Sequence, residues 1–172
     1  MRHSLRWTLA CIVVATAAQT ASASAEAPKF VSSFKDWTVY EVADGKGKMC
    51  YAASEPTSQD GNFKSRGNPA VLVARLPGSP PSEQVSVQPG YTYRKNSSVE
   101  VKIENRTFQL FTKGEHAWAR TEADDKALIE AMKRGSSMTV RGTSTRDTVS
   151  IDTYSLNGFK AAYDAMRDAC AK

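Results

Sequence analysis

The sequence contains little histidine and little cysteine: two histidines and three cysteines among 172 residues. His3 and Cys11 lie in a segment that we predict to be removed, so His116, Cys50 and Cys170 would remain. A catalytic triad would have to use His116 as its base, and a zinc site would need carboxylates for most of its ligands. We therefore expect no catalytic residues, no metal and no cofactor. A hydrolase that uses His116 is the alternative.

Long apolar runs are also missing, except near the start of the chain. There, an uncharged stretch over residues 7–18 follows a positively charged end and precedes the small residues 23–25. This order is typical of a secretory signal peptide, and the stretch is shorter than the roughly 20 residues of a membrane-spanning helix. We predict a cleaved signal over residues 1–25, one exported domain over residues 26–172, and no transmembrane segment after cleavage. Lipidation of Cys11 is the alternative.

The chain has no strong excess of one charge. Its formal net charge of +5 falls to +3 after cleavage, because Arg2 and Arg6 belong to the signal. Basic residues are interspersed with acidic ones, as in Lys102-Ile103-Glu104. A nucleic-acid interface needs a stripe of positive charge, so we expect no nucleic-acid partner.

The two cysteines that remain predict one disulfide bond. Exported proteins lie where disulfides persist, and two cysteines allow one intramolecular pair, Cys50–Cys170. Two free thiols or an intermolecular bond are the alternatives. An intramolecular bond would join the end of the chain to an early strand.

Residues 34–154 mostly alternate between apolar and polar side chains, which predicts strands. In the clearest case, Val99, Val101 and Ile103 share one face, while charged residues occupy the other. Residues 70–76 form a dense apolar run typical of a central strand, and the polar residues 55–69 predict an exposed loop or an irregular edge. In total we expect about nine strands.

Two segments show helical spacing instead. Thr121–Arg134 begins with a capping residue, Thr121 or Asp124, and ends with basic residues and a glycine. Ser155–Cys170 places an apolar stripe on one side, with Cys170 on that stripe. The predicted fold is mainly β: a β-sandwich or partly open barrel with two short helices, the second C-terminal and tethered by the disulfide.

Aromatic and basic side chains in turns and short strands are the candidate binding residues. Five of them form the predicted binding surface: Tyr91, Tyr93, Arg94, Lys95 and Trp118. Lys64 and Arg66 in the polar segment, and Tyr51 beside Cys50, are secondary candidates. Rings such as Tyr51 and Trp118 can stack on sugars or other flat partners. Packing in the core or in a solvated loop is the alternative for each residue.

Several short strings, in order, carry a family resemblance. They are Phe34–Tyr40, Cys50–Ser54, Glu83–Val87, Pro89–Tyr91, Phe108–Phe111, Ala117–Ala119, Ala131–Val140, Gly142–Ser144 and Asp152–Phe159. Their order and spacing over nearly the whole exported domain resemble the invasion-associated locus B (IalB) family of exported bacterial proteins. No catalytic residue is transferred by this resemblance.

The resemblance implies a protein of the Gram-negative envelope, in the periplasm or associated with the outer membrane or cell surface. It also implies a non-enzymatic binding or interaction module with an envelope or host-surface partner, and a role in host-cell invasion and virulence. The alternatives are an envelope hydrolase that uses His116 and a structural or stress-related periplasmic protein. The sequence names neither the partner nor the oligomeric state.

Overall fold

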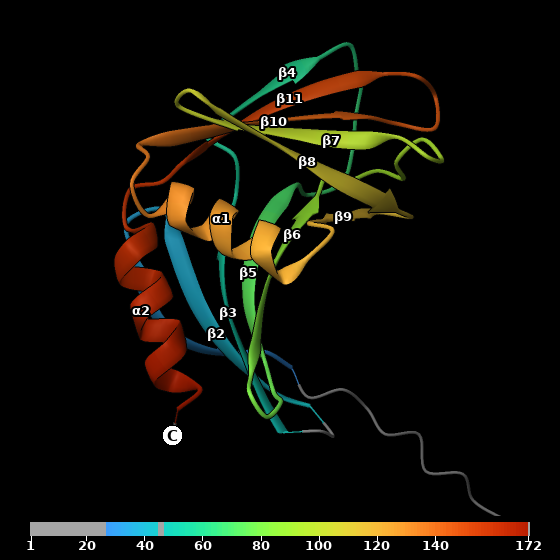
Figure 1. The fold of residues 1–172 in the computed structure, drawn as a ribbon. Helices are drawn as coiled ribbons and strands as arrows, with labels where there is room; N and C mark the ends of the chain where they lie inside the picture. Colours follow the sequence, from blue (N-terminus) through green and yellow to red (C-terminus); the bar gives the residue numbers. More distant parts are fainter. Residues whose placement is uncertain (1–26, 45–46, 172) are drawn as a thin grey trace, which may run out of the picture.

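Eleven strands form one antiparallel sheet, and two helices pack on it, in a computed structural model that describes residues 27–44 and 47–171 (Figure 1). The predicted signal peptide, residues 1–25, lies outside the described residues. The strands are β1 (Lys29–Phe34), β2 (Trp37–Asp44), β3 (Gly47–Ser54), β4 (Ser58–Gly61), β5 (Ala70–Leu76), β6 (Ser82–Gln88), β7 (Ser98–Ile103), β8 (Arg106–Lys113), β9 (His116–Trp118), β10 (Ser137–Thr143) and β11 (Val149–Ser155). The helices are α1 (Glu122–Met132) and α2 (Phe159–Ala169).

The strand order is β1-β2-β3-β5-β6-β9-β8-β7-β10-β11-β4, so β1 and β4 form the two edges. The sheet bends strongly, and β7, β10 and β11 cross above β2, β3 and β5 in Figure 1. Within the described part of the chain, no helix has the length and apolar content needed to cross a membrane.

The mainly β class, the two helices and the C-terminal disulfide are confirmed, but the sheet has eleven strands rather than about nine. One strand that the sequence did not reveal is β4, in the segment expected to be a loop or an irregular edge. All four of its residues are exposed, and it pairs with β11 along the edge of the sheet. A strand with no buried face has no apolar alternation, so its sequence carries no strand signal.

Both helices lie close to the predicted positions. The Thr121 hydroxyl accepts a hydrogen bond of 3.1 Å from the Asp124 backbone N–H, which confirms Thr121 as the cap of α1. Helix α2 begins at Phe159 rather than at Ser155, because Ser155 still pairs with β10 at the end of β11. Gly158 then turns the chain with φ 87°, and a Cβ atom there would lie 2.0 Å from the Phe34 carbonyl oxygen.

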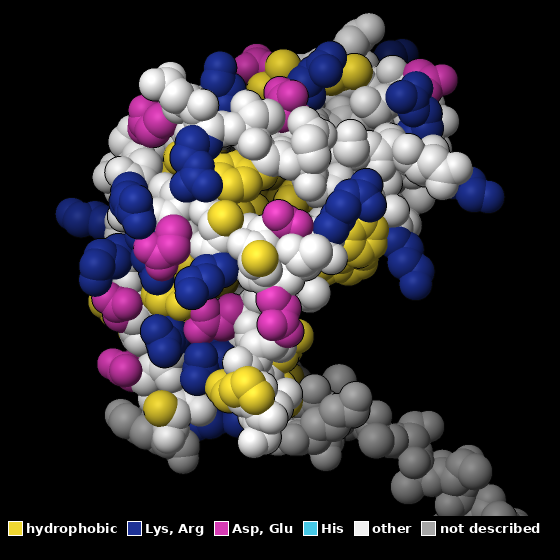
Figure 2. Space-filling model, viewed as in Figure 1, with side chains coloured by type: hydrophobic (Ala, Val, Ile, Leu, Met, Phe, Trp, Pro, Cys, Tyr) yellow, Lys and Arg dark blue, Asp and Glu magenta, His cyan; other side chains and the backbone are white. Residues whose placement is uncertain are grey.

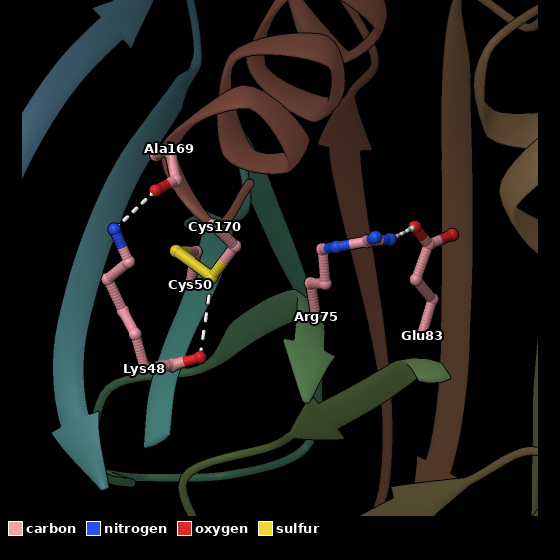
Figure 3. The surroundings of a disulfide bond; sticks show 6 residues. All are labelled: Lys48, Cys50, Arg75, Glu83, Ala169 and Cys170. Carbon is pink, nitrogen blue, oxygen red and sulfur yellow. Dashed lines mark hydrogen bonds and ion pairs between the residues drawn. A yellow bond between two sulfur atoms is a disulfide. The ribbon is translucent and has the colours of Figure 1, made fainter. Parts of the chain in front are cut away.

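Helix α2 is held against the first strands by packing and by the disulfide (Figure 3). The rings of Trp37 on β2 and Phe159 on α2 lie 4.7 Å apart, and both are fully buried. Cys50 on β3 bonds to Cys170, just after the helix. The Lys48 ammonium also donates a 2.6 Å hydrogen bond to the Ala169 carbonyl, where a cation suits the negative end of the helix dipole.

Candidate functional site

The five residues of the predicted binding surface have different environments. Tyr93 is only 3% exposed and packs in the core, with its ring 5.5 Å from that of Tyr91. Tyr91 is half-buried, and its hydroxyl forms a 2.7 Å hydrogen bond with Ser150. For the Tyr93 ring, the structure therefore favours packing over surface contact.

The other three residues lie closer to solvent. Arg94 and Lys95 are exposed, and Arg94 forms a 3.0 Å ion pair with Asp147. Trp118 is half-buried on β9, where its ring stacks on His116 with centroids 5.3 Å apart and an interplanar angle of 13°. The histidine considered as a catalytic base thus belongs to an aromatic cluster.

Arg66, a secondary candidate, is a buried anchor. Its guanidinium and the Asp152 carboxylate are 4% and 3% exposed and form a bidentate ion pair, with one contact at 2.9 Å. The remaining donors of Arg66 bind the Gln59 side chain and the Pro89 carbonyl. These bonds fix the segment between β4 and β5 over the inner side of β11. Lys64, on the same segment, is exposed.

Trp118 and Tyr51 share one surface of the sheet. In β2 and β3, the residues that face α2, such as Trp37 and Cys50, alternate with residues that face away from it. Strand pairing aligns the latter into two rows. One row contains Thr38, Ala53, Leu72, Ser86, Trp118 and Phe111. The other contains Phe30, Tyr40, Tyr51, Ala74 and Gln84. We call these two rows the aromatic face.

The rings of the aromatic face form two groups. Tyr40 and Tyr51 stack with centroids 5.2 Å apart and an interplanar angle of 24°, and Phe30 meets Tyr40 edge-on at 6.3 Å. Phe111 lies 5.7 Å from Trp118 in the second group. Small or uncharged side chains separate the groups. The result is a platform of aromatic rings whose two rows contain no charged side chain. The Arg120 guanidinium lies over the Phe111 ring, 5.9 Å from its centroid.

Exposure within the aromatic face is uneven. Phe30 is 58% exposed, whereas Tyr40, Tyr51, Phe111 and Trp118 are half-buried. Burial raises the pKa of the Tyr51 hydroxyl, so this ring stays neutral at physiological pH. Neither helix covers this side of the strands, since α2 packs on their opposite side.

Sequence reasoning identified Tyr51 and Trp118 but missed Phe30, Tyr40 and Phe111. The signal for Tyr40 was available: the turn that joins β2 to β3 places Tyr40 opposite Tyr51. The signal for Phe111 was weaker, because it depends on the register of β8 against β9. For Phe30 it was absent, because the bulge in β1 breaks the alternation there.

The two helices present a different surface on the other side of the molecule. Figure 2 shows Lys, Arg, Asp and Glu side chains spread over α1 and α2, with both signs of charge interspersed. Among the described residues, no group of three or more His, Cys, Asp or Glu side chains is placed to hold a metal ion.

Comparison with known proteins gives a family and a fold. The family model described as "Invasion associated locus B (IalB) protein" matches residues 37–167. The chain is also similar to the crystal structure of invasion associated protein B from Bartonella henselae, with a TM-score of 0.57 and 12% sequence identity. That similarity covers 82% of this chain and 98% of the Bartonella chain, and at such low identity it shows a shared fold. No curated protein matches the chain.

Proposed function

This chain belongs to the invasion associated locus B family, and from that premise we propose that it is a non-enzymatic binding module of the bacterial envelope. The observation that supports the proposal is the aromatic face, two rows of aromatic and uncharged side chains that neither helix covers. Aromatic side chains dominate binding energy where they are found at interfaces. Exposed apolar area of this kind marks a surface that contacts a partner.

The chemistry of the aromatic face favours a neutral glycan as the partner. Sugar rings have apolar C–H faces that suit stacking on aromatic rings. The two ring groups could each stack on a sugar, and strands β5 and β6 lie between them. Between the groups, on β6, the Gln84 amide and the Ser86 hydroxyl offer hydrogen bonds to sugar hydroxyls. The two rows contain no charged side chain that would attract a charged partner, and the guanidinium that meets them, that of Arg120, lies over the Phe111 ring.

A neutral glycan has two sources: the cell wall of the bacterium and the surface of a host cell. The role in invasion requires the second source, whereas an envelope role requires the first. The mature protein should therefore be tested against both, by co-sedimentation with isolated peptidoglycan sacculi and with erythrocyte membranes. Retention by either supports the proposal and identifies the source, and retention by neither overturns it.

The variant that tests the aromatic face is Tyr40→Ser with Tyr51→Ser and Trp118→Ser. Its affinity for the retaining probe should fall by at least about tenfold, because aromatic anchors account for much of the energy at an interface. A matched control changes Glu100, Lys102 and Arg141 to Ser on an exposed, charged part of the same sheet. If the triple aromatic variant does not fold, Phe30→Ser removes the most exposed ring alone. Affinity equal to that of the control would count against this face.

The same experiment addresses the enzymatic alternative. Sacculi incubated with the mature protein should release no soluble fragments above the background of buffer alone. Release that His116→Ala abolishes, in a protein that remains folded, would replace the binding module with a hydrolase. His116→Gln is the milder substitution, since it retains a hydrogen-bonding side chain beside Trp118.

A further inference from the structure

A polar cavity of about 430 Å³ lies away from the aromatic face, where three connecting segments meet. Residues 62–66 between β4 and β5 form one side, residues 90–92 after β6 form another, and residues 144–150 around the β10–β11 turn form the third. Its volume lies within the range of small-molecule sites. The family resemblance and the aromatic face assign no role to this cavity.

The floor of the cavity is built from polar groups that already have hydrogen-bond or ion-pair partners. Arg66 is neutralised by Asp152 beneath the segment, and the Tyr91 and Ser150 hydroxyls bond to each other at 2.7 Å. Ser144, which is 8% exposed, accepts hydrogen bonds from the backbone N–H groups of Arg146 and Thr148. Because these groups are already satisfied, they hold the walls in position for a ligand that binds above them.

The charge of the cavity is positive. Lys64 and Arg146 line it and are exposed, and neither forms an ion pair within the described residues. No acidic side chain lines the cavity in the described part of the chain. Of the carboxylates close in sequence to the lining, Asp147 and Asp152 are paired with Arg94 and Arg66, and Asp60 is exposed on the edge strand β4 outside the lining. Two unpaired cations around one cavity attract an anion, and both side chains donate several hydrogen bonds to phosphate oxygens.

The remaining lining suits a sugar. It offers the hydroxyls of Thr92, Thr145 and Thr148 and the Asn62 amide, which can both donate and accept hydrogen bonds. The Phe63 ring forms an apolar wall and is held by the Arg66 guanidinium, 4.5 Å from its centroid. An inorganic anion would use the two cations only, whereas a saccharide would also use the hydroxyls and the ring.

We propose that this cavity binds a phosphorylated saccharide, with the phosphate between Lys64 and Arg146 and the sugar against the threonine hydroxyls and Phe63. Such a group occurs as a free sugar phosphate and as the headgroup of a phosphorylated glycolipid. The two sources share the chemistry that the cavity recognises. This site is independent of the proposed function, since no residue of the aromatic face lines it.

The test is calorimetric titration of the mature protein with glucose 1-phosphate, compared with glucose and with inorganic phosphate. The sugar phosphate should bind at least about tenfold more tightly than either component, because it uses both parts of the lining. Lys64→Ala and Arg146→Ala should each weaken its binding by about tenfold. The control pair Lys102→Ala and Arg141→Ala removes two exposed cations that do not line the cavity and should change affinity by less than about twofold.

A second arm separates the two sources. Flotation with phosphatidylcholine vesicles that carry lipid A, a phosphorylated diglucosamine lipid, tests the headgroup in its membrane context. Binding to both probes, each weakened in the Lys64→Ala and Arg146→Ala double variant, shows that the headgroup chemistry suffices. Binding to the vesicles alone, weakened in the same way, assigns the cavity to the glycolipid.

Three outcomes would overturn the proposal: no binding to either probe, equal affinity for phosphate and glucose 1-phosphate, or unchanged affinity in the double variant. The Tyr40→Ser, Tyr51→Ser and Trp118→Ser variant should still bind the sugar phosphate. The double variant should in turn still bind the glycan probe. Failure of one site is thereby distinguished from failure of the other.

Discussion

The two halves of the sheet are held in place by different interactions. Strand β9 joins the two halves. In the first half, β1, β2, β3, β5 and β6, helix α2 packs on the inner side of the first four strands through the contact between Trp37 and Phe159 and the disulfide. In the second half, β7, β8, β10, β11 and β4, the buried ion pair of Arg66 and Asp152 fastens a polar segment over β11. The first half is therefore stabilised by apolar packing and a covalent bond, and the open end of the second by a buried charge pair.

The outer surfaces of the two halves differ in charge. The outer side of the first half carries the aromatic rows, whose described side chains are uncharged and centre on the half-buried Tyr40 and Tyr51. The outer side of the second half carries Glu100, Lys102 and Arg141, all exposed. Interspersed charges keep a sheet surface in water and oppose association. Their absence from the aromatic rows of the first half supports the proposed function.

The largest expected effect comes from breaking the charge pair. Asp152→Ala should lower the free energy of unfolding by about 3–5 kcal/mol, because Arg66 would remain buried without a counter-charge. Urea unfolding measures this directly. The double variant Arg66→Met with Asp152→Leu should lose less than Asp152→Ala, since no charge is then left unpaired. Arg94→Ala, which breaks an exposed ion pair at the same end of the molecule, should change stability little.

The opposite order of stability losses would contradict the role given to the buried ion pair in the second half. If Asp152→Ala were no more harmful than Arg94→Ala, the second half would not depend on its buried pair. The loss in Asp152→Ala should also appear as faster amide exchange in β4 and β11 than in α2. Uniform exchange over both halves would show that the pair stabilises the protein as a whole and not this half in particular.

Removal of the disulfide is the corresponding test of the first half. Cys50→Ser with Cys170→Ser should lower the free energy of unfolding by about 2–5 kcal/mol, because the bond constrains a loop with a sequence separation of 120 residues in the unfolded chain. The midpoint of thermal unfolding should fall by roughly 5–15 °C. Amide exchange should rise most in α2. Two reactive thiols per chain in the unreduced, denatured protein would instead show that the bond does not form.

Much of this difference between halves was predictable from the sequence. The disulfide followed from two cysteines in an exported chain, and the clean alternation of Val99, Val101 and Ile103 placed β7 correctly. These features depend on local pattern or on counting. The aromatic face required the register of several strands at once, which local pattern does not give. Only Tyr51 and Trp118 were identified, each as a separate ring.

The second half was harder to predict for a physical reason. Arg66 and Lys64 look alike in a polar segment, and only the fold shows that Arg66 is buried against Asp152 while Lys64 is exposed. A partner 86 residues away leaves no spacing signal. Tyr93 shows the same limit: the sequence leaves both surface contact and core packing open for this ring, and only the fold shows that it is buried.

An intermediate effect is expected where α1 meets the first half. The Asp125 carboxylate, 5% exposed, accepts a 2.8 Å hydrogen bond from the Val85 backbone N–H on β6, which takes the place of a strand partner. Asp125→Ala should lower the free energy of unfolding by about 1–3 kcal/mol, because that N–H would be buried without an acceptor. Denaturant unfolding near neutral pH checks this value.

The pH dependence distinguishes the charge of Asp125 from its hydrogen bond. Burial raises the pKa of Asp125 above its usual value near 4, so the folded protein holds this proton more tightly than the unfolded chain. The proton-linked part of the stabilisation from Asp125 is complete below the unfolded pKa and is lost as pH rises through the folded pKa, whereas the hydrogen bond from the Val85 N–H is kept by the ionised carboxylate. Asp125→Asn retains an acceptor and should remove this pH-dependent loss. An unchanged pH profile in Asp125→Asn would assign the dependence to other groups.

The smallest effect should come from Tyr154 in the second half. Its hydroxyl is buried on the inner side of β11 and has no hydrogen-bond partner in the described part of the chain. Tyr154→Phe should therefore change the free energy of unfolding by less than about 0.5 kcal/mol, since no hydrogen bond is lost. In the first half, the Trp37 indole N–H donates a 3.0 Å hydrogen bond to the Ser155 carbonyl. Trp37→Phe should be clearly more harmful, because it removes that bond and buried ring area. A loss above about 1 kcal/mol in Tyr154→Phe would mean that this hydroxyl does form a hydrogen bond in the folded protein.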